Sequence, residues 1–87
     1  MSVQRRLLPG MSALAAFEAV ARLGSFTAAA RELDLTQGAV SRQISLLEEQ
    51  FGRRLFQRDS RNVRLSAAGE IYADAVRSAL GQLRDAA

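Results

Sequence analysis

The chain has 87 residues and a formal charge of +3, which suits one small domain with a modest core. It lacks cysteine and histidine, so disulfides, the usual zinc ligands and the commonest nucleophile and general base are absent. No apolar run approaches the roughly 20 residues of a membrane span, and the first ten residues lack a signal-peptide core. We therefore expect a soluble, cytoplasmic protein with no membrane partner, catalytic site, metal ion or cofactor.

The distribution of charge is more informative than the net charge. All twelve basic residues are arginines, and the stretch from Arg42 to Arg64 holds six of them against three acidic residues. The planar guanidinium suits phosphates and guanine edges, so the cluster favours a nucleic-acid partner. GC-rich codon usage is an alternative explanation for arginine in place of lysine.

Residues 1–11 are expected to form a flexible lead-in that ends near Pro9 and Gly10. Ser12 then predicts the start of a first helix, with apolar residues at spacings of three and four, and Gly24 ends it. Ser25 predicts the start of a second helix with the inward residues Phe26, Ala29, Ala30 and Leu33, whose small members permit another helix to approach closely.

A tight turn at Asp34 and Leu35 is predicted to lead into a third helix that Thr36 caps, over about residues 36–51. Asp stands where glycine is common in such turns, and it tolerates a left-handed backbone better than most residues do. The inward stripe of the third helix is Val40, Ile44, Leu47 and Phe51, and Gly52 is expected to end the helix.

Two short strands, 53–57 and 62–65, are predicted to pair around a polar turn that begins at Arg58, which makes a wing of about residues 53–65. Ser66 begins a fourth helix over 66–87 with a long apolar stripe. A two-fold partner helix is the simplest cover for that stripe, although packing back on its own domain is the alternative. The predicted dimer interface is Ile71, Tyr72, Val76, Ala79, Leu80 and Leu83.

This order of elements predicts a mainly α fold, a winged helix-turn-helix over 12–65 followed by a linker helix. In such a fold the second helix of the motif reads base edges in the major groove, and other groups contact the backbone. The predicted base contacts are Gln37, Gly38, Ser41, Arg42 and Ser45. The predicted phosphate contacts are Ser25, Thr27, Thr36, Arg53 and Arg58, and the predicted minor-groove residues of the wing are Arg61 and Arg64. Helix capping by the hydroxyls and plain surface charge for the arginines are the simpler interpretations.

The run AFEAVARLGSFTAAARELDLTQGAVSRQISLLEEQFGRRLFQRDSRNVRLSAAG carries a family resemblance. With SFTAAAREL, TQGAVSRQI, LEEQFGRRLFQR and RLSAAG at this spacing, residues 12–87 resemble the N-terminal domain of LysR-type transcriptional regulators. The opening LLPGMSALAAFEAVARLGSF most resembles the branch that includes glycine-cleavage and beta-lactamase regulators. The resemblance implies a DNA-binding winged helix-turn-helix and a dimerising helix, with Gln37, Ser41 and Arg42 on DNA, Thr36 at a phosphate and Arg61 in the minor groove. The wing-tip residues Asp59 and Asn62 vary within the family's pattern.

Members of that family usually continue into a domain that senses a small-molecule effector, so the chain is interpreted as a fragment or a shortened form of such a protein. Two other function classes stay open. One is a protein-interaction module that uses only the fourth helix. The other is a small enzyme, against which the scattered carboxylates count, because they are interpreted as solvated helix faces: Glu18, Glu32, Asp34, Glu48, Glu49, Glu70 and Asp74.

Overall fold

The computed structural model describes residues 9–58 and 63–87. The described elements are α1 (Met11–Leu23), α2 (Phe26–Leu33), α3 (Gln37–Phe51), β1 (Phe56–Arg58), β2 (Val63–Leu65) and α4 (Ala67–Ala86). Three helices, a hairpin and a long last helix are the elements of a winged helix-turn-helix with a linker helix, so the predicted fold class is confirmed. In the described part of the chain, no helix combines the length and the apolar character that crossing a membrane requires.

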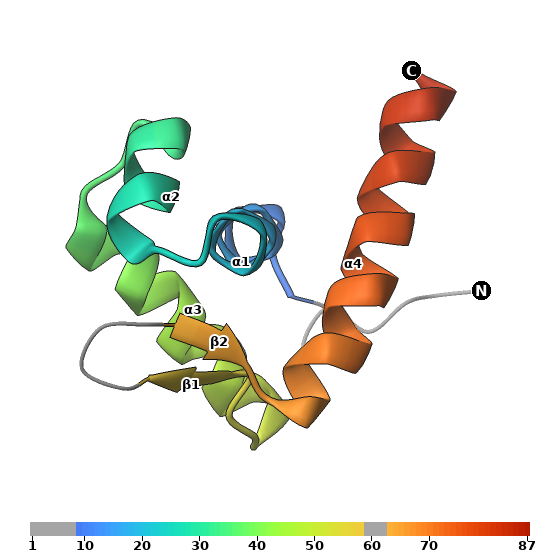
Figure 1. Cartoon of the computed structure of the whole chain (residues 1–87). Coiled ribbons are helices and arrows are strands. Elements are labelled where there is room, and N and C mark those ends of the chain that lie inside the picture. The colour runs from blue at the N-terminus through green and yellow to red at the C-terminus, as the bar shows by residue number, and fades with distance from the viewer. Residues whose placement is uncertain (1–8, 59–62) are drawn as a thin grey trace.

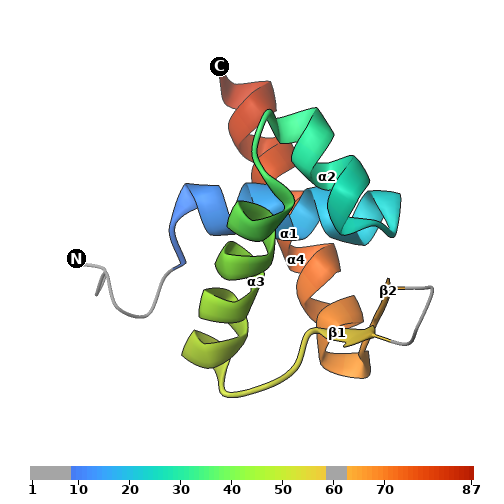
Figure 2. The same cartoon turned by 90° about the vertical axis from the view of Figure 1, so that its left-hand side faces the viewer.

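Helix α1 lies at the centre of the molecule and packs against the other three helices. Figure 1 shows α2 and α3 on one side of α1 and α4 on the other, with the hairpin beneath. In Figure 2, α3 lies in front of α1, with α2 and the hairpin beside it. One face of α3 therefore has no other described element over it.

The core joins all four helices and the hairpin. Its largest fully buried side chains are Phe17, Val20, Val40, Ile44, Leu47, Leu55 and Phe56. Aromatic rings connect the layers, because the Phe17 ring lies 5.3 Å from that of Phe56 and 5.2 Å from that of Tyr72, measured between centroids. The Phe51 ring meets Tyr72 edge-on at 4.4 Å, and such pairs add to the hydrophobic gain of burial.

Most of the predicted helix ends are confirmed. The side chains of Ser25, Thr36 and Ser66 each accept a hydrogen bond from the backbone N–H three residues on, at 3.0 Å. Gly24, Asp34 and Gly52 end the first three helices in the left-handed conformation, with Asp34 at φ 57°. Only a short turn separates the end of α2 at Leu33 from the start of α3 at Gln37, so these two helices form a helix-turn-helix.

The predicted start of α1 was two residues late. Gly10 is the N-cap, and its carbonyl accepts a bond from Leu14 N at 3.1 Å, so Met11 and Ser12 belong to the first turn of the helix. Gly10 has extended backbone angles and no side-chain cap. The predicted lead-in 1–11 is thus too long by one residue, and residues 1–8 lie outside the described part of the chain.

The first wing strand is shorter than predicted, and position 62, where the second was predicted to begin, lies outside the described residues. Phe56 pairs with Leu65, Gln57 with Arg64 and Arg58 with Val63 in an antiparallel hairpin. Arg58, which was predicted to begin the turn, is the last residue of β1, and residues 53–55 are not strand. Glu48 holds the backbone where β1 begins, because its Oε2 accepts bonds from Leu55 N at 2.8 Å and Phe56 N at 3.3 Å.

Helix α4 turns one face to its own domain, which corrects part of the predicted dimer interface. Val76 is 4% exposed and belongs to the core, and Tyr72 and Leu80 pack against that core. The other predicted residues, Ile71, Ala79 and Leu83, are exposed. The apolar residues of α4 do follow a helical period, as predicted. They cover two faces of the helix, however, and the domain itself buries one of these faces.

Candidate nucleic-acid interface

The outer face of α3 carries the predicted base-reading residues. Gln37, Gly38, Arg42 and Ser45 are exposed and Ser41 is half-buried, whereas Val40, Ile44 and Leu47 are buried on the opposite face. Gln37 and Arg42 lie neither inside the protein nor beneath α4, so both side chains are accessible to a partner. The face lies on the first turns of α3, next to its positive dipole end.

A contact between the two helices of the motif involves Gln37. The Thr27 hydroxyl of α2 donates a hydrogen bond to Gln37 Oε1, with 3.3 Å between the oxygens. Thr27 was predicted to contact a phosphate. In the free domain its hydroxyl instead bonds the first residue of the candidate reading helix.

Ser25 and Thr36 both cap the helices that follow them, as the simpler interpretation held. Accepting a bond uses one lone pair of the hydroxyl oxygen and leaves its O–H as a donor. The N-termini of α2 and α3 also present backbone N–H groups and a positive dipole end. These hydroxyls are therefore compatible with capping and with an anion contact at the same time.

Arg58 at the end of β1 stacks on α2. Its guanidinium carbon lies 4.7 Å from the centroid of the Phe26 ring, in the geometry of a cation–π contact. Phe26 is the first residue of α2 and lies between Ser25 and Thr27, so the contact brings a wing arginine to the start of the motif. Arg64 stands on β2 across from Gln57, and Arg61 lies outside the described residues.

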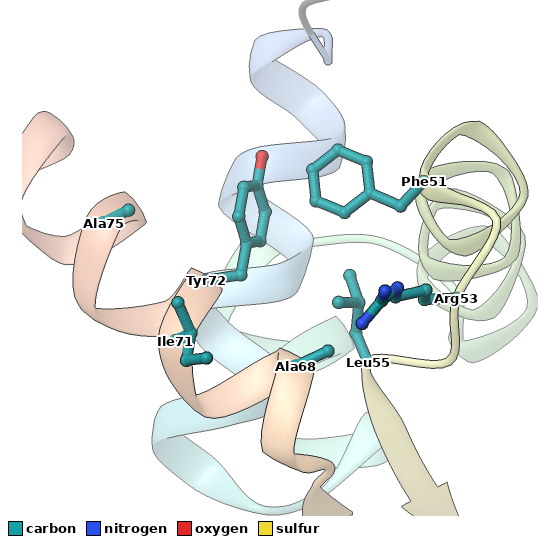
Figure 3. A pocket seen from close by; sticks show the side chains of 7 residues that line it. All are labelled: Phe51, Arg53, Leu55, Ala68, Ile71, Tyr72 and Ala75. Atoms are coloured by element: carbon teal, nitrogen blue, oxygen red, sulfur yellow. The ribbon is translucent and has the colours of Figure 1, made fainter.

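Arg53 is separated from these residues. It follows the C-terminal end of α3, and the 15 residues of that helix span roughly 20 Å at about 1.5 Å each. There it lines an apolar groove of about 370 Å³ with Phe51, Leu55, Ala68, Ile71, Tyr72 and Ala75 (Figure 3). The structure thus brings Arg58 close to the motif and leaves Arg53 beside α4.

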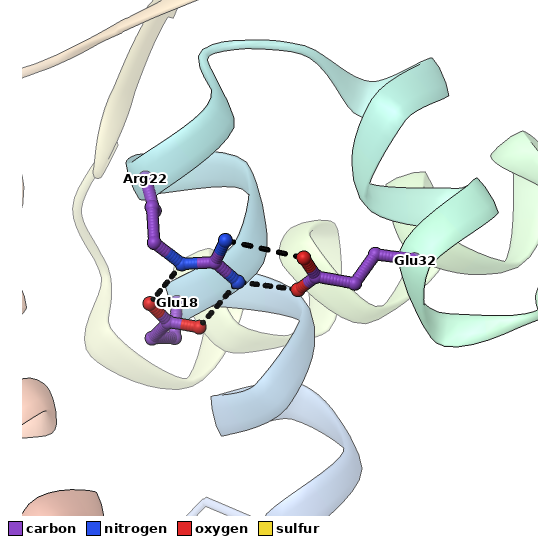
Figure 4. Close-up of polar contacts among 3 residues, drawn as sticks. All are labelled: Glu18, Arg22 and Glu32. Carbon is purple, nitrogen blue, oxygen red and sulfur yellow. Dashed lines mark hydrogen bonds and ion pairs between the residues drawn. The ribbon is translucent and has the colours of Figure 1, made fainter.

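Two carboxylates that were predicted to be merely solvated hold Arg22. Arg22 Nε bonds Glu18 Oε2 at 2.8 Å, and the same guanidinium bonds Glu32 of α2 (Figure 4). The hydrogen bonds and charges of Glu18 and Glu32 raise the pKa of Arg22, and Arg22 in turn lowers the pKa of Glu32. This triad connects α1 to α2. The two carboxylates compensate the charge of Arg22, which a count of basic residues would assign to the basic surface.

Arg42 has a different electrostatic environment. None of the ion pairs found among the described residues includes it. No acidic side chain of the described residues therefore pairs with the Arg42 guanidinium on the exposed face of α3. The described residues also contain no group of three acidic, histidine or cysteine side chains placed to share a metal ion.

Two residues that position the interface were missed by sequence reasoning. Glu48 was interpreted as solvated, but it fixes the backbone that enters the wing. Gly69 was not singled out, and a Cβ at that position would lie 2.0 Å from the Leu55 carbonyl oxygen. The glycine that closes the RLSAAG motif was the available signal, because a glycine in the first turns of a helix often marks close backbone approach.

Residues 11–70 match the family model of bacterial regulatory helix-turn-helix proteins of the lysR family. The chain belongs to the LysR family. Over 79 residues, this LysR-type chain is 51% identical to the HTH-type transcriptional regulator TrpI of Pseudomonas aeruginosa, with 91% of the chain and 27% of that protein covered. It is 44% identical to the glycine cleavage system transcriptional activator of Escherichia coli K12, with 91% and 26% covered. The chain thus spans about a quarter of the length of these relatives.

Solved structures give the same assignment. The LysR-type chain is 34% identical to the BenM DNA-binding domain in its complex with benA site 1 DNA, with a TM-score of 0.84 and coverage of 87% of this chain and 85% of that chain. For the CbnR DNA-binding domain in a DNA complex, the identity is 32%, the TM-score is 0.82 and the coverage is 88% of both chains. The similarity therefore extends through the winged helix-turn-helix and into α4.

Proposed function

We propose that this LysR-type domain binds double-stranded DNA sequence-specifically as part of a bacterial transcription regulator, with α3 in the major groove. The observation that carries the proposal is the exposed face on the first turns of α3, where Gln37 and Arg42, which has no ion pair within the described residues, stand opposite the buried stripe. The BenM and CbnR domains that it resembles are themselves bound to DNA in their structures. The proposed DNA binding takes place in the cytoplasm, where bacterial DNA lies.

Each group on α3 has chemistry that suits a base edge. Arginine pairs bidentately with guanine, glutamine with adenine, and serine with either a base or a phosphate. A Cβ at Gly38 would meet nothing within 4 Å, so this position has open space for a close approach of the backbone to DNA. Arg42 and Gln37 are assigned the main reading roles, with Ser41 and Ser45 beside them.

Backbone contacts set the register. The N-termini of α2 and α3, with Ser25 and Thr36, offer N–H groups and hydroxyls to phosphates. Arg58, held on Phe26, extends this surface toward the wing, and Arg64 and Arg61 are assigned to the backbone or minor groove beyond it. These contacts supply affinity and orientation, while α3 supplies the preference for sequence.

A second copy of the chain is the proposed cover for the outer face of α4. Ile71, Ala75, Ala79 and Leu83 recur every four residues along it, and Ile71 and Leu83 are 76% and 58% exposed. Ile71 and Ala75 also border the apolar groove, so the two surfaces are continuous. A two-fold helix pair would bury the same stripe on both copies and set the distance between two reading helices. Sensing of a small-molecule effector is assigned to the part of a full-length regulator that this chain does not span.

The experiment selects bound sequences from a random duplex pool with the whole chain and compares the wild type with Arg42→Ala. Removal of a bidentate base contact is expected to cost about 1–3 kcal/mol, roughly 5- to 150-fold in affinity, and to relax the preference at one base position. The affinity should also fall with salt, at a log–log slope of about −0.9 per phosphate neutralised.

Arg77→Ala is the matched control, because Arg77 lies on α4 and pairs with Asp74. It should keep the wild-type affinity within about twofold, as surface substitutions usually do. If the wild type enriches no sequence, or if Arg42→Ala leaves the selected sequences and the affinity unchanged, the reading role of α3 is wrong.

A further inference from the structure

The hydrogen bond from Thr27 to Gln37 joins two exposed side chains at the start of the two motif helices. Thr27 is the second residue of α2 and Gln37 is the first residue of α3. The helices come close because Ala29 and Ala30 of α2 are buried and small, and because the left-handed Asp34 makes the turn between them short. The contact is therefore built by the packing of the motif.

We propose that Thr27 is a positioning residue that decides which way round the Gln37 amide faces DNA. The inference rests on the proposed DNA-binding function and adds a determinant of its base preference. It also assigns Thr27 a different role from a plain phosphate contact.

The argument begins with the donors and acceptors of the two side chains. In the bond that forms, the threonine hydroxyl donates its one hydrogen to the carboxamide oxygen of Gln37, which can only accept, so Oε1 faces Thr27; a turned-over amide would have to donate from Nε2 to the hydroxyl oxygen instead. The carboxamide group is planar, so Nε2 with its two N–H donors then lies on the other side of the carboxamide carbon.

This orientation has a consequence for base reading. With Oε1 engaged by Thr27, the group that Gln37 offers first is a donor, so in this orientation Gln37 makes a single bond to a base acceptor in place of the bidentate pair with adenine. Guanine, adenine and thymine all present acceptors at the major-groove edge, whereas cytosine presents the N4 amino donor. Thr27 should therefore strengthen discrimination against cytosine at the base that Gln37 reads. Without the hydroxyl, the amide can turn over and present its oxygen, which accepts from cytosine.

The bond should matter more in the complex than in the free domain. Both side chains are exposed, and a hydrogen bond between exposed groups competes with water. Displacement of water by DNA lowers the local dielectric and strengthens the bond. Loss of the hydroxyl should consequently change base preference while leaving the stability of the domain nearly unaltered.

The test compares Thr27→Val, which keeps the shape without the hydroxyl, with Thr27→Ser, which keeps the hydroxyl. The base read by Gln37 is first located as the position at which Gln37→Ala loses preference, and affinities are then measured with each of the four base pairs there. Thr27→Val should reduce the discrimination against cytosine about 3- to 10-fold, the size expected for one net hydrogen bond. Thr27→Ser should keep the discrimination against cytosine within about twofold of the wild type. When Gln37 is already alanine, Thr27→Val should leave the relative affinities for the four base pairs unchanged.

An independent readout needs no DNA. In the free chain, the side-chain amide signals of Gln37 in a nitrogen–proton correlation spectrum should move in Thr27→Val and stay near their wild-type positions in Thr27→Ser. Circular dichroism checks that all variants keep the helical content of the wild type.

Two results would overturn the assignment of Thr27 while leaving the proposed function intact. One is an equal loss of affinity for all four base pairs, present also without Gln37, which would make Thr27 a phosphate contact. The other is an unchanged base preference in Thr27→Val. If the wild-type chain itself binds DNA without sequence preference, or not at all, the proposed function fails and the role of Thr27 fails with it.

Discussion

Three arginines of this domain have different neighbours, and these neighbours indicate a different role for each. Arg22 is held between Glu18 and Glu32 and connects two helices. Arg58 rests on the Phe26 ring. Arg42 stands exposed on α3 with no acidic partner among the described ion pairs. A count of arginines along the sequence gives these three residues equal weight, whereas their neighbours in space do not.

Tyr72 gives a spectroscopic probe at the same scale, because the chain has one tyrosine and no tryptophan. Its ring packs between Phe17 and Phe51, and burial raises the pKa of its phenol above the ordinary value of about 10. Titration of the tyrosinate absorbance near 295 nm should therefore give a midpoint above 10 in the folded chain.

The same shift gives a sign for stability. The pKa of Tyr72 is higher in the folded chain than in the unfolded chain. Its contribution to the free energy of unfolding is therefore full below about pH 10 and is lost as the pH rises through the folded pKa. Chemical unfolding of the wild type should therefore show a falling free energy above pH 10, and Tyr72→Phe should remove that part of the decline. A tyrosine midpoint at or below 10 in the folded protein would contradict the packing described for this ring.

At the scale of elements, hydrogen bonds between neighbouring segments set the place of the wing. Glu48 of α3 holds the start of β1 through two backbone N–H groups. Ser66 Oγ donates to the Arg54 carbonyl at 2.7 Å while it caps α4. The entry to the hairpin is thus tied to the helix before it and to the helix after it.

The two glycines of α4 should respond oppositely to alanine. A Cβ at Gly69 would lie 2.0 Å from the backbone oxygen of Leu55, whereas at Gly81 its nearest neighbour is the end of the Arg84 side chain at 3.8 Å. Gly69→Ala should destabilise the domain by about 1–3 kcal/mol or more through overpacking. Gly81→Ala should stabilise it by about 0.5–1 kcal/mol through helix propensity. Denaturant unfolding of both variants checks the pair, and equal effects would show that α4 does not approach Leu55 as described.

At the scale of the whole molecule, α4 belongs to two surfaces. Gly69, Ala73 and Val76 are buried against the domain, and the stripe that begins at Ile71 and ends at Leu83 is exposed. Burial of a large exposed isoleucine and leucine on each of two copies is a favourable source of association energy. This division would let one helix support the domain and also form the proposed pair with a second copy.

The proposed dimer is tested with Ile71→Glu and Leu83→Glu. Sedimentation of the wild-type chain should show a dimer, and the double variant should be a monomer, because a two-fold pair would place the new charges in an apolar contact on both copies. Leu46→Glu is the control, since Leu46 on α3 is also half exposed but lies on another element. A monomeric wild type at tens of micromolar, or dissociation in the control as well, would rule out the α4 stripe as the interface.

Sequence reasoning predicted the local features of this fold because local chemistry decides them. Ser25, Thr36 and Ser66 cap helices with their own hydroxyls, and Gly24, Asp34 and Gly52 end them in a conformation that few other residues adopt easily. The spacing of Val40, Ile44 and Leu47 likewise gave the buried side of α3 and so its outer face.

Tertiary structure decided the features that depend on distant segments. The 3.6-residue period shows that a helix face is apolar, but it does not say whether the same chain or a second copy covers it, and so Val76 was placed in a dimer interface when it lies in the core. Glu48 and Gly69 act on the backbone of Leu55, and Thr27 acts on a glutamine ten residues away. By itself, the sequence determined the order of elements, most of the helix ends and the exposed face of α3. Only the folded chain decided which residues support that face, because those contacts join segments that sequence spacing does not relate.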